Sequence, residues 1–297
     1  MEFITVERLD EGAILRITLN RPEQRNAQHR GLLVELDTAF AEAEADDAVR
    51  VVILAGAGPS FSAGHDLGSS EAIAQREPGP QQHSSYRENG GTRLAAEQRW
   101  LQESAYYFRN TLRWRNLRKI TIAQVQGKVL SAGLMVAWSC DLITAAEGTE
   151  FADVVASRLG MCGVEYFAHP WELGPRRAKE LLLTGDSLGV DEAYQIGMVS
   201  KVFPSDALAD RTLEFARRIA AVPTAASLMI KESVNQSVDN MGFYNGLQAA
   251  FTVHQLNHAH WAEIRGDGRP IARLEDGIDD WRSPSPIRMR VRDQPSA

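Results

Sequence analysis

The chain has few cysteines and no excess of positive charge. Its 297 residues include only two cysteines, and nothing in their spacing predicts a disulfide scaffold, which favours a reducing compartment such as the cytoplasm. Lys and Arg number 32 against 39 Asp and Glu, giving a formal net charge of −7. Without a broad basic field, sequence-independent capture of nucleic acid is not expected, and no nucleic-acid partner is predicted.

Long apolar runs are also missing. No run approaches the length of a membrane span, and the first ten residues carry acidic groups where a signal peptide needs positive charge. We therefore expect a protein that is neither exported nor embedded in a membrane. The 44% of hydrophobic residues is ample for the core of one large domain or two modest ones.

What is present is a regular alternation of strand and helix patterns. Alternating apolar residues at 3–6 and 14–19 predict a β-hairpin, helical spacing over 30–45 predicts a helix, and the apolar run 51–54 predicts a buried strand. The same order returns as a strand at 120–125, a helix of small residues at 131–140 and a strand at 142–145. This alternation predicts an α/β fold.

Two regions depart from that alternation. The polar stretch between Leu67 and Arg99 contains helix-breaking Pro and Gly, and it predicts a mobile loop or lid before helical spacing resumes over 100–117. Beyond Pro204 the pattern is helical at 208–221, 225–237 and 243–264, and the tail 282–297 is expected to be poorly ordered or to strap a neighbouring subunit. We expect a core of residues 1–204 and a C-terminal helical oligomerisation region and tail of residues 205–297.

Two turns of small residues each follow a predicted buried strand, at 61–67 and 126–133. Glycine lets the backbone approach closely, and a helix that begins after such a turn has unpaired N–H groups. Two convergent donors suit a thioester carbonyl that becomes an enolate or tetrahedral oxyanion, and losing one donor typically costs roughly 3 kcal/mol. Either turn alone is more often an ordinary strand-to-helix connection, but together they predict an oxyanion hole.

Four segments in this order, 19–27, 62–67, 127–141 and 182–186, resemble the crotonase superfamily, the enoyl-CoA hydratase/isomerase family, within a match over about 3–235. The resemblance implies a crotonase-like spiral of ββα units with a C-terminal helical trimerisation subdomain. It also implies an acyl-CoA substrate and a homotrimer or dimer of trimers. Coenzyme A is part of that substrate, so no separate cofactor is expected.

The resemblance assigns site residues by position. The oxyanion hole is expected to consist of the backbone N–H groups of His65 and Ala132. The residues expected to bind substrate are Arg25, Ala63, Gly64, Asp66, Leu67, Gly133 and Met135. Among them, Arg25 is expected to contact the CoA phosphates or adenine, and Asp66 is expected to cap the helix after the first turn.

Two positions depart from the family's hydratases. The glutamate that lies three positions after the second oxyanion donor is replaced by Met135, whose thioether cannot move a proton at neutral pH. The second glutamate is replaced by Val154 or Val155. Because hydration needs one group to activate water and one to protonate carbon, we expect a divergent member that lacks both usual hydratase glutamates.

Other carboxylates could take their place. Glu165 is the preferred acid/base candidate, since dehalogenases and dienoyl-CoA isomerases of this fold have a working aspartate nearby; the alternative is a surface or N-cap glutamate. Asp153 is the second catalytic candidate, although it more plausibly caps a helix over 154–159. The sequence leaves the choice between Glu165 and Asp153 open.

Histidines and aromatic residues allow further alternatives. The ring of His65 could titrate near the thioester, and His169 either reaches the pocket or packs with a hydrogen bond to backbone. His254 and His258 lie one helical turn apart, a spacing that could bind zinc, but the sequence shows no third ligand and no metal is expected. The aromatic and basic stripe 106–115 is expected to pack one apolar face, or to line the acyl pocket.

Three functions remain for the chain. The favoured one is an enoyl-CoA hydratase-like lyase acting on acyl-CoA, with isomerase, hydrolase or dehalogenase-like variants that use Glu165. The second is a catalytically weak acyl-CoA-binding paralogue, which the loss of both glutamates would fit. The third, a purely structural interaction module, is disfavoured because both oxyanion turns are intact.

Overall fold

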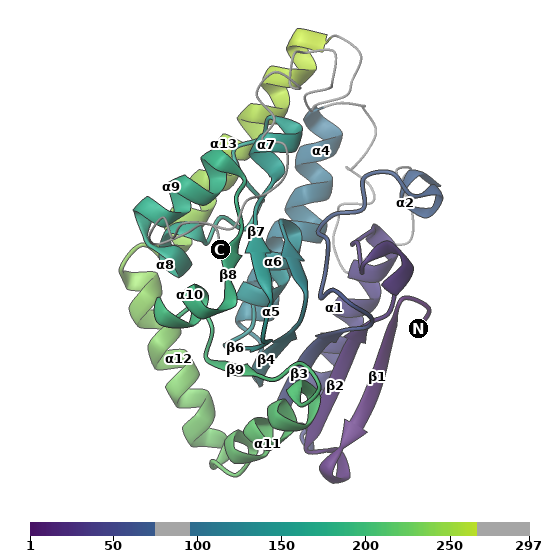
Figure 1. Cartoon of the computed structure of the whole chain (residues 1–297), viewed down its shortest axis with the longest axis vertical. Coiled ribbons are helices and arrows are strands. Elements are labelled where there is room, and N and C mark those ends of the chain that lie inside the picture. Colours follow the sequence, from purple (N-terminus) through teal and green to yellow (C-terminus); the bar gives the residue numbers. More distant parts are fainter. Residues whose placement is uncertain (75–95, 266–297) are drawn as a thin grey trace, which may run out of the picture.

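The computed structural model describes residues 1–74 and 96–265, and Figure 1 shows strands and helices alternating through most of that chain. The N-terminal part contains β1 (Ile4–Leu9), η1 (Asp10–Gly12), β2 (Ile14–Leu19), η2 (Pro22–Gln24), α1 (Arg30–Ala45), β3 (Val51–Gly56) and α2 (Ser70–Ala74). The next part contains α4 (Ala96–Gln102), η3 (Glu103–Arg109), α5 (Asn110–Arg115), β4 (Ile120–Val125), β5 (Lys128–Leu130), α6 (Ala132–Trp138), β6 (Leu142–Ala146) and β7 (Glu150–Ala152).

The C-terminal part is mostly helical. It contains α7 (Val155–Leu159), α8 (His169–Leu173), α9 (Pro175–Thr184), β8 (Leu188–Gly189), α10 (Val190–Gln195), β9 (Lys201–Phe203), α11 (Leu208–Ala220), α12 (Thr224–Asn240) and α13 (Phe243–Arg265). The three helices predicted beyond Pro204 are therefore confirmed. Within the described ranges, no helix is both long and apolar enough to cross a lipid bilayer.

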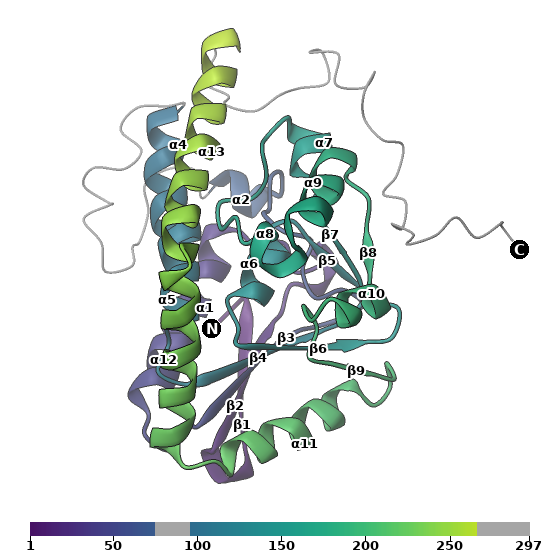
Figure 2. The same ribbon diagram turned by 90° about the vertical axis from the view of Figure 1, so that its left-hand side faces the viewer.

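Six strands form the main sheet in the order β1-β2-β3-β4-β6-β9, and β5-β7-β8 form a second, smaller sheet. The β1–β2 pair is antiparallel, which confirms the predicted hairpin, and the remaining pairs of the main sheet are parallel. Parallel strands need covered faces on both sides, because their crossover helices pack there. Figure 2 shows the two sheets close together, with α6 beside them.

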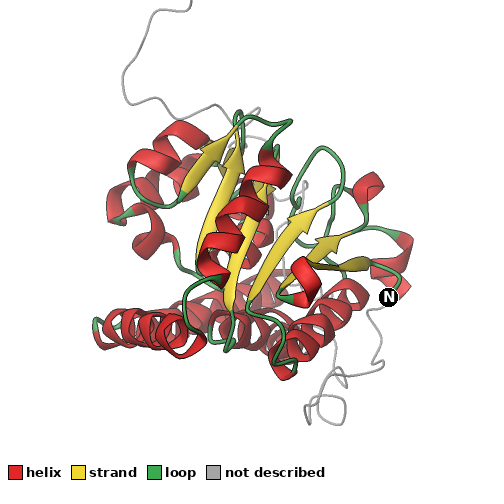
Figure 3. Ribbon diagram, turned by 90° about the horizontal axis from the view of Figure 1, so that it is seen from below, coloured by secondary structure: helices red, strands yellow, loops and turns green. Residues whose placement is uncertain are grey.

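The central strands divide their side chains between two apolar layers. On β3, Val52 and Leu54 belong to the large core, whereas Val51 and Ile53 belong to a smaller cluster with Ala216 of α11. This alternation is the period of two that a strand imposes on its side chains. Figure 3 shows α11 crossing the face of the sheet that this smaller cluster covers. The apolar run predicted as a buried strand is thus buried on both faces.

Helix α13 belongs to the large apolar core that also contains residues of α1 and the central strands. Phe243, Leu247 and Phe251 of α13 join the large apolar cluster, and α13 packs against α4. The helical segment predicted over 100–117 is confirmed as α4, η3 and α5, but its middle part, η3, is a π-helix. π-Helical turns are rare and occur often at functional sites. The division at residues 204 and 205 stays a prediction.

The predicted lid and tail lie largely outside the described residues. Of the stretch between Leu67 and Arg99, the structure describes α2 and the start of α4, and residues 75–95 are outside its description. The tail 282–297 is also outside it.

Candidate active site

The two predicted oxyanion turns lie against each other. A parallel bridge pairs Ser62 with Val129, and the N–H of Leu130 donates to the carbonyl of Ser62 at 2.9 Å. Gly64 has φ +92°, and a Cβ there would lie 2.9 Å from the Leu130 carbonyl oxygen and 3.2 Å from the Ala132 nitrogen. Only glycine fits this position without displacing the second turn. Segments 67 residues apart in sequence, as Ser62 and Val129 are, therefore meet at one point.

Both predicted donor groups remain unused by the backbone. The bridge between Gln28 and His65 uses the carbonyl of Gly64 and the N–H of Asp66, and the N–H of His65 takes no part in it. At the second turn the neighbouring Ser131 N–H donates to the Ala152 carbonyl at 2.8 Å. Within the described chain, neither His65 N–H nor Ala132 N–H donates a backbone hydrogen bond. His65 lines the cavity, whereas Ala132 is fully buried and lies behind the lining residue Ser131.

Ser131 holds the second turn in an uncommon conformation. It has φ 47° and ψ −113° and directly precedes α6. A non-glycine residue at positive φ costs of the order of 1–3 kcal/mol and is found mainly where the surrounding structure needs it. The first helical residue after it is Ala132, so this strained position sets the direction of the donor N–H.

A cavity of about 610 Å³ opens beside these turns. This volume lies within the usual range for small-molecule sites. Of the residues predicted for the site, those that line the cavity are Arg25, Ala63, His65, Leu67 and Glu165. Val154 and Val155 form part of its apolar wall. Tyr107 lines it too, so one residue of the aromatic stripe faces the pocket while Tyr106 and Phe108 are buried in the core.

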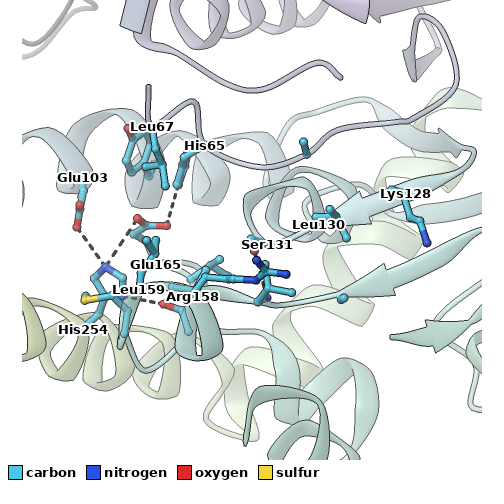
Figure 4. A pocket seen from close by; sticks show the side chains of 18 of the residues that line it. His65, Leu67, Glu103, Lys128, Leu130, Ser131, Arg158, Leu159, Glu165 and His254 are labelled. Atoms are coloured by element: carbon cyan, nitrogen blue, oxygen red, sulfur yellow. Dashed lines mark hydrogen bonds and ion pairs between the residues drawn. The ribbon is translucent and has the colours of Figure 1, made fainter. Parts of the chain in front are cut away.

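Glu165 and the ring of His65 form a pair on the cavity wall (Figure 4). His65 Nε2 lies 3.0 Å from Glu165 Oε2, and the imidazole stacks on Tyr107 with ring centroids 3.8 Å apart. Glu165 is only 4% exposed, which excludes the alternative of a surface glutamate. Nδ1 of His65 is buried without a hydrogen-bond partner among the described residues. The 3.0 Å contact lets a proton pass between the two side chains.

A second group of buried polar side chains adjoins Glu165. His254 Nε2 lies 3.7 Å from Glu165 Oε1 and 3.3 Å from Glu103 Oε2, and His258 Nε2 lies 3.1 Å from Glu103 Oε1. Burial favours the neutral forms, but the charge of His258 and hydrogen bonds from both histidines hold the pKa of Glu103 well below its usual value. Burial lowers the pKa of His254, but hydrogen bonds with Cys162 and Glu103 and the nearby carboxylates raise it well above its usual value. Glu103 was not anticipated from the sequence.

Asp153, the second catalytic candidate, does not line the cavity. Its side chain is fully buried and accepts hydrogen bonds from the N–H groups of Val155 and Val164 at 3.0 and 3.2 Å. His169 Nε2 lies 3.0 Å from its second oxygen. Burial raises the pKa of Asp153, yet the His169 contact and the N–H donors outweigh it and lower the pKa. Asp153 accepts from the first N–H of α7 but precedes the N-cap residue, which is Val154, and His169 bonds this carboxylate rather than backbone.

Two residues predicted to bind substrate also lie elsewhere. Met135 is 1% exposed, packs in the core from α6 and does not line the cavity. Asp66 pairs with Arg21 at 2.9 Å and accepts from Ser69. Burial raises the pKa of Asp66, but the bonds from Ser69, Arg21 and Gly68 lower it to about 2. Asp66 fixes the turn beside His65 rather than lining the cavity.

The remaining glycines shape the site. A Cβ at Gly133 would lie 2.6 Å from the carbonyl oxygen of Ser62, so this residue lets α6 begin against the first turn. Neither Gly64 nor Gly133 is among the residues that line the cavity. Their contribution is the close approach of the two turns.

Sequence comparison identifies the family. The profile described as Enoyl-CoA hydratase/isomerase matches residues 10–265. The chain belongs to the enoyl-CoA hydratase/isomerase family. It is 64% identical over 294 residues to a putative enoyl-CoA hydratase, EchA13, of Mycobacterium tuberculosis H37Rv, covering 99% of this chain and 92% of that protein. It is 31% identical to the 1,2-epoxyphenylacetyl-CoA isomerase of Escherichia coli K12, covering 81% and 84%.

Solved structures of the family have the same fold. A probable enoyl-CoA hydratase from Mycobacterium smegmatis superposes with a TM-score of 0.81 at 41% identity, covering 92% of this chain and all of that one. An enoyl-CoA hydratase/isomerase from Xanthobacter autotrophicus Py2 superposes with a TM-score of 0.72 at 29% identity, covering 95% and 97%. The predicted crotonase-like α/β fold with a helical C-terminal region is confirmed.

Proposed function

We propose that this protein is an enoyl-CoA hydratase that polarises the thioester carbonyl of an acyl-CoA with the N–H groups of His65 and Ala132. Glu165, paired with the ring of His65, is the acid/base group. The observation that carries the proposal is the close approach of the two turns, each with an unused N–H, beside a cavity that Glu165 lines. The 64% identity to a putative enoyl-CoA hydratase supports the reaction type.

The chemistry follows from these positions. When water adds to the β-carbon of an enoyl thioester, negative charge develops on the thioester oxygen, and two N–H donors stabilise it. Glu165 accepts the proton of the attacking water, and the α-carbon of the enolate then takes a proton from the Glu165–His65 pair. The 3.0 Å contact within the pair lets one proton pass between its members. Two groups joined in this way meet the requirement for two proton transfers.

The phosphates of CoA need cationic partners at the cavity. Arg25 and Lys128 both line it, and Lys128 also pairs with Glu150. Guanidinium and ammonium groups bind phosphates well. We propose that Arg25 contacts the phosphates or adenine of CoA, as its position in the family implies.

We also propose a homotrimer or dimer of trimers, with the C-terminal helices at the subunit contacts. Large apolar side chains are exposed on α12 and α13, namely Met229, Ile230, Val234, Val253 and Leu256. An exposed apolar surface of this kind is typical of protein–protein contacts. The cytoplasm is the proposed location, in keeping with two unpaired cysteines. Sedimentation of the purified protein tests the oligomeric state.

The test of function is the loss of conjugated thioester absorbance when the protein is mixed with crotonyl-CoA and longer enoyl-CoAs. Turnover is expected, and Glu165→Gln should lower kcat at least about a hundredfold because it removes the proton carrier. Glu180→Gln, an exposed glutamate on α9, is the matched control and should keep the rate. Calorimetric binding of acyl-CoA without turnover would instead support the binding paralogue.

A further inference from the structure

Three buried side chains on the cavity wall have no role in the proposed reaction. Glu103 is the first residue of the π-helix η3, and His254 and His258 lie one turn apart on α13. They are 3%, 3% and 4% exposed. Figure 4 shows Glu103 and His254 directed at each other, with Glu165 beside them. All three line the cavity, so a small ion can reach them from it.

Their ligand atoms have the spacing of a metal coordination sphere. His254 Nε2 and His258 Nε2 are 3.1 Å apart, and the distances from each to a Glu103 oxygen are 3.3 and 3.1 Å. Metal–ligand bonds of about 2.0–2.2 Å place neighbouring tetrahedral ligands about 3.3–3.6 Å apart and octahedral ones about 3 Å apart. The two Glu103 distances are to its two different oxygens, and one ligand atom from each of the three residues lies within 4.8 Å of the others, so a small rotation of the carboxylate brings all three onto a single cation.

The contacts behind these atoms orient them as metal ligands are usually oriented. His254 Nδ1 lies 2.9 Å from the Gly163 carbonyl oxygen, which can only accept, so Nδ1 carries a proton and Nε2 faces the cluster. The amide of Gln255 donates to Glu103 Oε2 at 2.8 Å. In metal sites, the histidine ligands usually donate their second N–H to a group such as a backbone carbonyl, and the carboxylate ligands usually accept a further hydrogen bond.

The charge of the cluster also favours a cation. Glu103 and the adjacent Glu165 provide two buried negative charges. A divalent cation bound to two neutral imidazoles would leave these four groups without net charge, which lowers the cost of burying them.

We propose that Glu103, His254 and His258 bind one divalent transition-metal cation, zinc in the first instance, at the cavity wall beside Glu165. Two imidazoles and a carboxylate are a ligand set that suits zinc and ferrous iron, and three protein ligands leave a coordination position open. Glu165 Oε1, 3.7 Å from His254 Nε2, lies next to the cluster. The site does not depend on the proposed hydratase reaction, because it is defined without substrate.

The experiment is a calorimetric titration of the chelator-treated full chain with Zn²⁺, repeated with Co²⁺ while its visible ligand-field absorption is recorded. We expect one cation per chain and an absorption spectrum typical of Co²⁺ bound by nitrogen and oxygen. His258→Ala should weaken binding at least about a hundredfold, and Gln255→Ala should weaken it about ten- to a hundredfold. Zn²⁺ should also raise the melting temperature of the wild type but not that of His258→Ala.

Two variants make the result decisive. His260→Ala removes an exposed histidine from the same helix and should bind Zn²⁺ as the wild type does. Glu103→Gln keeps the size of the side chain and removes its charge, so it tests the site even if His258→Ala is unstable. No binding by the wild type, or equal binding by wild type, Glu103→Gln and His258→Ala, would overturn the site. Neither result would bear on turnover of enoyl-CoA.

Discussion

The molecule contains two histidine–carboxylate pairs with the same 3.0 Å separation and different surroundings. His65–Glu165 lines the cavity, and in both pairs Nδ1 of the histidine has no partner among the described residues. His169–Asp153 is fully buried, and the carboxylate also accepts from two backbone N–H groups. The distance between partners therefore does not identify a catalytic pair. What separates the pairs is whether they line the cavity and what else the carboxylate binds.

The largest expected effect is on stability, at the buried pair. Asp153→Asn replaces one acceptor oxygen by an NH₂ group among the donors that now surround it. Removing one partner of a buried pair typically costs about 3–5 kcal/mol, and we expect a loss near the lower limit in the free energy of unfolding. Urea denaturation measures it. The kcat per folded molecule should stay close to that of the wild type. A hundredfold loss of kcat with normal stability would instead indicate that Asp153 is the catalytic acid/base group.

The opposite result is expected at the cavity pair. Glu165→Gln should lower kcat at least about a hundredfold, equivalent to about 2.7 kcal/mol of activation free energy. Glu165 lines a cavity, whereas Asp153 is buried in the core. Glu165→Gln should therefore lower the free energy of unfolding by less than Asp153→Asn does. Denaturation and turnover are measured on the same preparations. A variant that unfolds easily but turns over normally would reverse the assignment of the two pairs.

The oxyanion turn gives the next effect. Gly64→Ala places a Cβ 2.9 Å from the Leu130 carbonyl and near the Ala132 nitrogen, so it should move one donor and lower kcat by about ten- to a hundredfold. Gly148→Ala is the matched control, since Gly148 also has positive φ, +77°, but has nothing within 4 Å of an added Cβ. It should cost stability without changing the rate. Equal rates for the two variants would show that Gly64 is not needed to position the oxyanion donors.

The smallest effect is a pH dependence of stability at Asp66. Its folded pKa of about 2 lies below the ordinary value of 3.8, so its stabilising contribution is complete above about pH 4 and is lost as pH falls toward 2. We expect about 1–2 kcal/mol from this group. Unfolding of wild type and Asp66→Asn at pH 5 and pH 2.5 measures it. If the free energy of unfolding falls by the same amount between pH 5 and pH 2.5 in both proteins, Asp66 does not contribute to the pH dependence.

The sequence predicted the parts of the structure that local patterns control. The hairpin, the buried strands and the small-residue turns at 61–67 and 126–133 follow from side-chain period and glycine, and each is found where expected. Met135 was predicted to contact substrate from its offset to Ala132. In the structure Met135 does not line the cavity, because the direction of a helical side chain depends on the packing of α6, which buries Met135 in the core.

Side-chain partners distant in sequence could not be predicted. Glu103 meets His254 and His258 only because α13 packs back along the helical segment that contains η3. Likewise, the choice between Glu165 and Asp153 depends on which carboxylate faces the cavity. The spacing of apolar residues in the sequence does not show this. The spacing of His254 and His258 is visible in the sequence. A third ligand close to them in the chain would have completed a metal-binding motif, but Glu103 lies far from them in sequence.

The most direct test of the oxyanion hole formed by His65 and Ala132 is a crystal structure with butyryl-CoA, a saturated thioester that cannot be hydrated. We predict a thioester oxygen within about 2.7–3.1 Å of both the His65 and Ala132 nitrogens, with the acyl carbons facing Glu165. A thioester bound with its oxygen away from either nitrogen would contradict it.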